Sequence, residues 1–238
     1  MAEPAIVITC EHAVNTIPEP WQPLFREAAD LLESHRGWDP GALQLARLLA
    51  GTLAAPCHAA QVSRLLIDHN RSPHNRALWS KISRTIPTPE KNHLIDVYYA
   101  PFRQRVADWI AAQCAGGKQV LHLSIHSFTP VLDGQERPVD IGLLYYPWRP
   151  EESFFAACLK AHLKRGMPGL RVRRNLPYRG RSDAHLSSYR KAYSSRDYVG
   201  LELEVNQALV GAGKEWPARQ RMIAVALQAA LQEIYTAE

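Results

Sequence analysis

The sequence has few cysteines, no long apolar run and no Ser- or Gly-rich linker, and each absence excludes a class of protein. It contains only 4 cysteines, which lie too far apart for a zinc-knuckle pattern or a disulfide framework. We therefore expect a reducing, cytoplasmic environment. No window approaches the ~18 apolar residues of a membrane span, and residues 1–10 lack the basic flank and the apolar length of a signal peptide. No membrane partner is expected.

What remains is an ordinary globular composition. Apolar residues make up 46% of the 238 residues and charged residues 21%, which excludes a disordered, collagen-like or coiled-coil chain. A chain of this length can bury roughly 70% of the surface that its unfolded form exposes, so it needs no stabilising cross-links. Because no linker divides the sequence, we expect a single domain over residues 1–238.

The net charge of +5 is concentrated in one segment. Residues 160–196 carry eleven Lys or Arg and a single acid, Asp183. Such a block can contact nucleic acid or hold an anionic substrate, although most charge runs are solvated faces. Nothing in it resembles a zinc finger, an RNA-recognition strand or a basic heptad, so we expect no nucleic-acid partner.

Apolar periodicity predicts strands that alternate with helices. The predicted strands cover residues 5–9, 58–66, 119–126, 140–146, 171–175 and 198–206. The predicted helices cover residues 23–34, 40–53, 95–114, 151–164 and 217–236. This order favours an α/β domain with helices on both faces of a mostly parallel sheet.

Polar residues follow several of the predicted strands at the point where each strand ends. In open α/β sheets, sites form in the loops beyond the carboxyl ends of the strands. The residues at these positions are Glu11, His12, Arg64, Asp68, Asn70, Arg71, His126, Glu204 and Asn206. Because four strands each contribute His, Arg or Glu, we expect one site at this edge of the sheet.

His12 and His126 are candidate metal ligands, since a catalytic zinc site needs three protein ligands and an open position. A lone strand-end histidine is more often only hydrogen-bonded. The third ligand is open: Asp39, which alternatively caps the following helix, competes with Glu11 and Asp68. Arg64 and Arg71 are candidates for gripping a carboxylate or polarising a carbonyl, with surface ion pairing as the alternative.

The segments ITCEHAVNTIP, HRGWDPGA, VSRLLIDHNRS, LSIHSFTP and GLELEVNQAL together resemble the N-formylglutamate amidohydrolase family, over about residues 6–210. The order of an arginine, Asp-x-Asn-Arg, a strand-end histidine and a late glutamate is also similar to that of zinc carboxypeptidases and aspartoacylases. The resemblance implies a three-layer αβα sandwich with a mixed, mostly parallel central sheet, of the phosphorylase/hydrolase-like kind.

The resemblance implies a zinc ion bound by His12 and His126. The carboxypeptidase pattern His-x-x-Glu would place a carboxylate at Asn15, which cannot serve as an anionic ligand, whereas Asp39 fits the amidohydrolase family's own pattern. Many formylglutamate hydrolases carry Ser-Pro-His-Ser-Gly where residues 10–14 of this chain read Cys-Glu-His-Ala-Val. That departure bears on the substrate more than on the chemistry.

The resemblance also implies roles for other strand-end residues. Arg64 matches the arginine that polarises the scissile carbonyl, and Asn70 with Arg71 matches the pair that binds the α-carboxylate of the substrate. Glu204 matches the general base. Glu202 shares its strand face by the period of two, but Glu204 lies about 6–7 Å nearer the carboxyl end, so we expect Glu202 to pair with a nearby arginine instead.

We therefore expect a zinc-dependent amidohydrolase that acts on a small N-acyl amino acid. N-formylglutamate, cleaved to glutamate and formate, is the leading substrate. The segment containing Asn175, Tyr178 and Arg181 is a candidate for closing over an acidic side chain. The alternatives are a carboxypeptidase-like zinc peptidase and a non-enzymatic protein that binds a polyanion or nucleic acid through residues 160–196.

Overall fold

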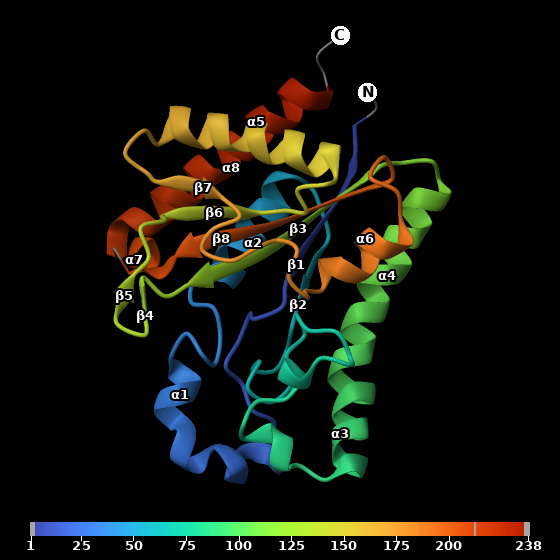
Figure 1. The fold of residues 1–238 in the computed structure, drawn as a ribbon, viewed down its shortest axis with the longest axis vertical. Helices are drawn as coiled ribbons and strands as arrows, with labels where there is room; N and C mark the ends of the chain where they lie inside the picture. Colours follow the sequence, from blue (N-terminus) through green and yellow to red (C-terminus); the bar gives the residue numbers. More distant parts are fainter. Residues whose placement is uncertain (1–2, 212, 236–238) are drawn as a thin grey trace.

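A six-stranded sheet in the order β2-β1-β3-β8-β6-β7 forms the centre of the computed structural model, which describes residues 3–211 and 213–235 (Figure 1). Its strands are β1 (Ala5–Cys10), β2 (Cys57–Ala59), β3 (Val120–Phe128), β6 (Ile141–Leu144), β7 (Val172–Arg174) and β8 (Tyr198–Asn206). Strands β2, β1, β3 and β8 run parallel, and β6 is antiparallel to β8 but parallel to β7. The prediction of an α/β fold with a mixed, mostly parallel sheet is confirmed. A separate hairpin joins β4 (Val131–Leu132) to β5 (Gln135–Glu136).

Helices cover both faces of the sheet, which gives three layers. The α-helices are α1 (Ala29–Glu33), α2 (Ala42–Thr52), α3 (Thr88–Leu94), α4 (Ala100–Ala115), α5 (Pro150–Gly166), α6 (Leu186–Ala192), α7 (Gln207–Val210) and α8 (Trp216–Tyr235). Shorter 3-10 or π segments are η1 (Glu19–Ala28), η2 (Arg76–Leu78), η3 (Ser83–Thr85), η4 (Ile95–Tyr99) and η5 (Gly213–Glu215). The largest apolar core packs α2, α5 and α8 against one face. Helices α4 and α6 lie against the other (Figure 1).

The two faces of the central strands differ sharply in polarity. In β8 the odd residues, such as Leu201 and Leu203, belong to the core under α5 and α8, as the alternation predicts. The even residues Glu202 and Glu204 point to the opposite side and line a cavity there. Strand β3 follows the same rule, with Ile125 in the core and His126 lining that cavity.

Two predicted elements are wrong in extent. The strand predicted over 58–66 stops at Ala59, because the next residues form turns fixed by Ser63, whose backbone N–H donates to Thr16 O and whose Oγ donates to Gly37 O. The apolar residues there pack into a second, smaller core with Trp21 and Phe25 instead of the sheet. The α-helix predicted over 23–34 is divided: residues 23–28 belong to the 3-10 segment η1, where Pro23 removes a helical N–H, and residues 29–33 form the α-helix α1.

The long helix predicted over 95–114 ends as expected before Gly116 but begins earlier, at Thr88. It runs through α3, the π-helical turn η4 and α4 (Figure 1). Pro101 lies at the start of α4, where its missing N–H is tolerated because the π turn has already interrupted the regular hydrogen-bond ladder. The other predicted helices and strands are confirmed within a few residues.

Among the described residues, no helix is both long and apolar enough to cross a lipid bilayer. That residues 1–238 form one domain stays a prediction.

The packing beside β6 yields a stability prediction. A Cβ on Gly142 would lie 2.2 Å from Leu176 O and 3.2 Å from Glu204 Cβ. Gly142→Ala should therefore lower the free energy of unfolding by about 1–3 kcal/mol in urea denaturation. Gly166→Ala is the matched control, because no described atom beyond the neighbouring backbone of its own helix lies within 4 Å of its Cβ position, and it should be neutral or stabilising by about 0.4–1 kcal/mol. Equal losses at both positions would contradict the close approach of residue 176 to β6.

Candidate functional site

A cavity of about 390 Å³ lies at the carboxyl ends of β1, β3 and β8. The residues expected to bind the metal, bind the substrate or act in catalysis all line it: His12, Asp39, Arg64, Asn70, Arg71, His126, Tyr178 and Glu204. Glu11, Asp68 and Asn206, expected at the same edge, do not line it. The parallel pairing of β1, β3 and β8 explains this convergence, because it brings the ends of these strands to one edge of the sheet.

His12, Asp39 and His126 form a compact buried group. Asp39 Oδ2 lies 3.3 Å from His12 Nδ1 and 2.8 Å from His126 Nδ1. The three ligand atoms lie within 4.8 Å of one another, and all three residues are buried. Asp39 does not cap the following helix, since Gly41 is the N-cap residue of α2. Its carboxylate is instead turned toward the two imidazoles.

The outer nitrogen of each imidazole has its own partner. His12 Nε2 lies 2.7 Å from Asp68 Oδ1, which accepts a hydrogen bond from it. His126 Nε2 lies 2.9 Å from Ser124 Oγ and 3.3 Å from Glu11 Oε2. Asp68 and Glu11, the competing third ligands, therefore lie behind the histidines and not between them. Asn15 is turned away and donates to Glu33 Oε1.

This arrangement fits a divalent metal ion. When each imidazole carries its proton on the outer nitrogen, Nε2, both Nδ1 atoms and Asp39 Oδ2 direct lone pairs toward one another. Lone pairs that converge in this way repel unless a cation or shared protons lie among them. Without a metal, burial opposes charge on His126, but Asp39 and Glu11 raise its pKa well above the usual value. For Asp39, burial acts in the opposite direction, and the two histidines hold its pKa below the usual value.

Two arginines surround this group. Arg64 Nη2 donates to Asp68 Oδ2 at 3.2 Å, and its Nη1 lies 3.7 Å from Asp39 Oδ1. Arg71 Nη1 donates to the carbonyls of Asn70 and Asp183. The side chains of Arg64 and Arg71 are 26% and 29% exposed, so both guanidinium groups border the open part of the cavity.

Asn70 lies between the histidines and the segment that follows β7. Its Oδ1 accepts a hydrogen bond from the backbone N–H of His185 at 2.7 Å, and its Nδ2 lies 3.4 Å from His126 Nε2. Asp183 also fixes this segment, because its Oδ2 accepts from Ser72 N and Asn75 Nδ2. The loop containing Asn70 and the segment 178–185 thus form one wall of the cavity.

Glu204 lies opposite His126 in the β3–β8 pairing. Its Oε2 is buried and has no hydrogen-bond partner among the described residues. Burial, with the nearby charges of Asp39 and Glu202, raises its pKa to about 8. Burial also raises the pKa of Glu202. The expected arginine partner of Glu202 acts only through its charge: Arg190 lowers the pKa of Glu202 but donates its hydrogen bonds to Glu152.

The rim of the cavity is basic and aromatic. Tyr178 accepts from Arg137 Nη1 at 2.8 Å and is 43% exposed. Asn175, expected nearby, instead builds the loop, since its Oδ1 accepts from Tyr145 N and Gly180 N. Further lining residues that the sequence did not identify are His35, Arg36, Arg179 and Ser182. They lie in turns, where no periodicity marks them.

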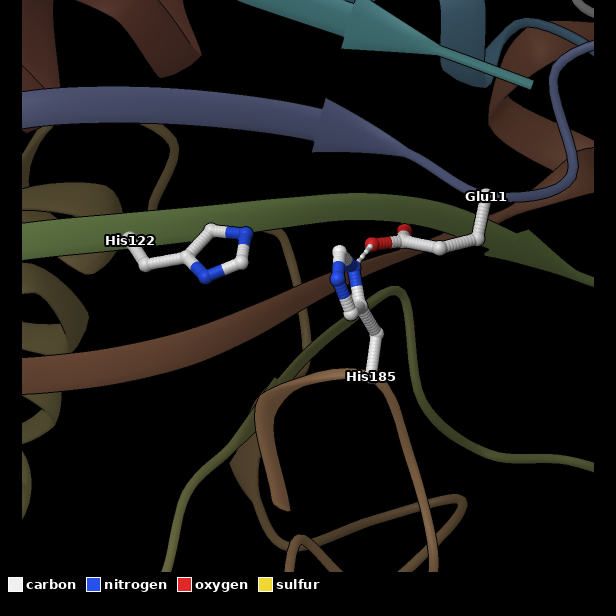
Figure 2. A group of neighbouring side chains, drawn as sticks. All are labelled: Glu11, His122 and His185. Carbon is white, nitrogen blue, oxygen red and sulfur yellow. Dashed lines mark hydrogen bonds and ion pairs between the residues drawn. The ribbon is translucent and has the colours of Figure 1, made fainter. Parts of the chain in front are cut away.

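A second buried group consists of Glu11, His122 of β3 and His185, and the side chains of Glu11 and His185 point toward each other (Figure 2). His122 is hydrogen-bonded to Thr9 Oγ1 and Tyr198 OH, and His185 to Glu11 Oε1 and Tyr189 OH. Both nitrogens of His122 have hydroxyl partners and not a carboxylate partner, so we interpret this group as a hydrogen-bond network. The expectation that His122 is structural agrees with these contacts.

A third group combines Cys158 and His162 of α5 with Glu233 of α8. His162 Nε2 lies 2.8 Å from Glu233 Oε2, and the side chain of Glu233 is 59% exposed. Glu233 brings this group to the surface, and none of its residues lines the cavity. A measurement of bound metal therefore has to distinguish metal in this surface group from metal in the cavity.

The fold and the cavity define an α/β protein with a polar, metal-compatible pocket at the carboxyl edge of its sheet. The sequence model of the N-formylglutamate amidohydrolase family matches residues 5–210, so the chain belongs to that family. The resemblance seen in the sequence is confirmed, and the family supports hydrolysis of amide bonds.

Solved structures share the fold of this chain. The chain is 31% identical to gene product Atu2144 from Agrobacterium tumefaciens, with a TM-score of 0.83 over 98% of this chain and 92% of that one. It is 17% identical to N-formylglutamate amidohydrolase from Ralstonia eutropha JMP134, with a TM-score of 0.71 over 99% of this chain and 96% of that one. The second similarity shows the fold alone. No curated protein matches the chain.

Proposed function

We propose that this protein is a zinc-dependent amidohydrolase that cleaves an N-acyl amino acid, with N-formylglutamate as the leading substrate. The observation that carries the proposal is the convergence of His12 Nδ1, Asp39 Oδ2 and His126 Nδ1 in the same cavity as Glu204 Oε2, which has no hydrogen-bond partner in residues 3–211 and 213–235. Three buried ligands beside a free carboxylate are the arrangement that metal-assisted hydrolysis requires.

His12, Asp39 and His126 would hold the metal. A zinc ion bound there would supply Lewis acidity and lower the pKa of a water molecule toward ~7. Asp68 and Ser124 hold the outer edges of the two imidazoles, so the rings need little reorganisation to bind.

Glu204 would act as the general base. Its free Oε2 accepts a proton from the attacking water and later returns it to the leaving amine. A buried carboxylate without donors is well suited to this exchange, because no hydrogen bond opposes its protonation. Arg64, which borders the cavity, would donate to the oxygen of the scissile carbonyl as negative charge develops there.

The cavity is suited to an anionic amino-acid substrate. Arg71, with the amide of Asn70, would bind the α-carboxylate. Arg36, Arg179 and the hydroxyl of Tyr178 would face a second, acidic side chain. The alternative of polyanion binding through residues 160–196 is less well supported, because Arg171 is paired with Asp140 and Arg190 with Glu152.

The first functional prediction concerns the metal. His126→Ala should lose the stoichiometric zinc of the cavity and the hydrolytic activity together, because two ligands are too few for a stable site. Zinc content is measured by elemental analysis after dialysis of untagged protein. Cys158→Ser is the control, since it disables the surface group and should keep both zinc and activity. Full zinc in the His126→Ala variant would remove His126 from the metal site.

The second prediction separates the two buried glutamates. Glu204→Gln should retain fold and zinc but lower kcat by roughly 100-fold or more, because an amide cannot accept the proton of the water. Glu202→Gln is the matched control on the same strand face and should change kcat far less. Steady-state kinetics with N-formylglutamate gives both values. The reverse order of effects would assign the general base to Glu202.

The third prediction concerns the α-carboxylate of the substrate. Arg71→Lys keeps the charge but loses the planar fork, so KM should rise by about tenfold or more. With the unchanged enzyme, a substrate amidated at that carboxylate should lose most of its kcat/KM. Equal turnover of the acid and the amide would exclude Arg71 from carboxylate binding.

A further inference from the structure

His126 is backed by a continuous set of buried hydrogen bonds. Ser124 Oγ donates to Glu11 Oε2 at 2.7 Å and lies 2.9 Å from His126 Nε2. The other oxygen of Glu11, Oε1, lies 2.8 Å from His185 Nδ1 (Figure 2). His185 Nε2 in turn lies 2.9 Å from Tyr189 OH. All of these polar groups are buried, and Glu11, Ser124 and His185 are 0% exposed.

The number of protons available decides which group donates and which accepts in each of these hydrogen bonds. A hydroxyl has one proton to donate, and that of Ser124 goes to Glu11, which as a carboxylate only accepts. Ser124 Oγ must therefore accept from His126, so His126 carries a proton on Nε2. On the other side, His185 Nδ1–H donates to Glu11, which leaves His185 Nε2 to accept from Tyr189 OH at 2.9 Å, a shorter contact than the 3.4 Å from that hydroxyl to Arg103 O. Each donor of this set then has an acceptor, and Asn70 Nδ2, which lies 3.4 Å from His126 Nε2, is not a partner of that nitrogen but lowers the pKa of Glu202.

We infer that Ser124 and Glu11, with His185 behind them, are positioning residues that hold a proton on His126 Nε2 and so present Nδ1 to the metal. This inference rests on the proposed metal site and adds the residues that prepare one of its ligands. The contacts assign His12 the same tautomer through a different partner, Asp68. The two ligands therefore depend on separate buried carboxylates.

The neighbouring strand offers a matched control. Thr9 of β1 lies opposite Ser124 of β3 in the parallel pairing, and both are 0% exposed. Thr9 Oγ1 lies 2.8 Å from Nε2 of an imidazole, as Ser124 Oγ lies 2.9 Å from one, but that imidazole belongs to His122. Thr9→Val and Ser124→Ala thus each remove one buried hydroxyl that contacts one histidine. Only the histidine beside Ser124, His126, is a proposed metal ligand.

The experiment measures zinc affinity by competition with a chromogenic chelator at fixed pH, on full-length chains that also carry Cys158→Ser. Ser124→Ala should weaken zinc binding by about 10-fold or more, whereas Thr9→Val should stay within about 2-fold. Thermal unfolding of the metal-free proteins should show similar losses for both variants. Glu11→Gln, which keeps the side-chain volume, is the second test and should weaken zinc binding by a factor similar to that of Ser124→Ala.

A direct readout accompanies the affinities. Nitrogen-15 NMR of the zinc-loaded chain should show His126 bound through Nδ1, with its proton on Nε2. Binding through Nε2, unchanged affinity in both Ser124→Ala and Glu11→Gln, or equal weakening by Thr9→Val would overturn the inference and leave the metal site intact. Absence of stoichiometric zinc in the Cys158→Ser chain would overturn the metal site and, with it, this inference.

Discussion

The carboxylate of Asp39, held between two imidazole rings, is the interaction on which the site depends. It joins three segments that are distant in the sequence: the end of β1, the turn before α2 and the end of β3. Burying a carboxylate is costly unless donors or a cation surround it. The backbone N–H of Ser127 donates to Oδ2, and the Nδ1 atoms of His12 and His126 face the same oxygen, so a cation or shared protons held among them would meet that need. A group balanced in this way tolerates little displacement of any of its three segments.

The polar face of the sheet follows from this constraint. On one side of β1, β3 and β8 the side chains are apolar and pack under α2, α5 and α8. On the other side the same strands carry Thr9, His122, Ser124, Glu202 and Glu204, all buried. Most of these groups find a partner within the layer, which satisfies the rule that buried polar atoms are hydrogen-bonded. At the carboxyl edge of the sheet this hydrogen bonding is incomplete, because Glu204 Oε2, beside the cavity, has no hydrogen-bond partner among the described residues.

The sequence was sufficient where a repeating physical pattern existed. The alternation in residues 198–206 predicted β8 to the residue, and parallel pairing placed the ends of β1, β3 and β8 at one edge. Patterns failed in turns, where Ser63 fixes a bend and apolar residues pack into the smaller core instead of extending β2. The contacts of Glu11 with Ser124 and His185 span 113 and 174 positions of the chain, and no local pattern encodes such pairs.

The buried carboxylates of the site divide according to the donors around them. Burial alone would raise the pKa of Glu11 and Asp68, but imidazole and guanidinium donors hold both well below the usual values. These two therefore stay ionised and serve as fixed anions behind the histidines. Glu204 has similar burial, but no donor reaches its Oε2 from the part of the chain that the structure describes, and its pKa is raised to about 8. A cation held at Asp39 would lower that value by electrostatic attraction. The same residue type thus provides fixed charges where donors are present, and a group able to exchange a proton where they are absent.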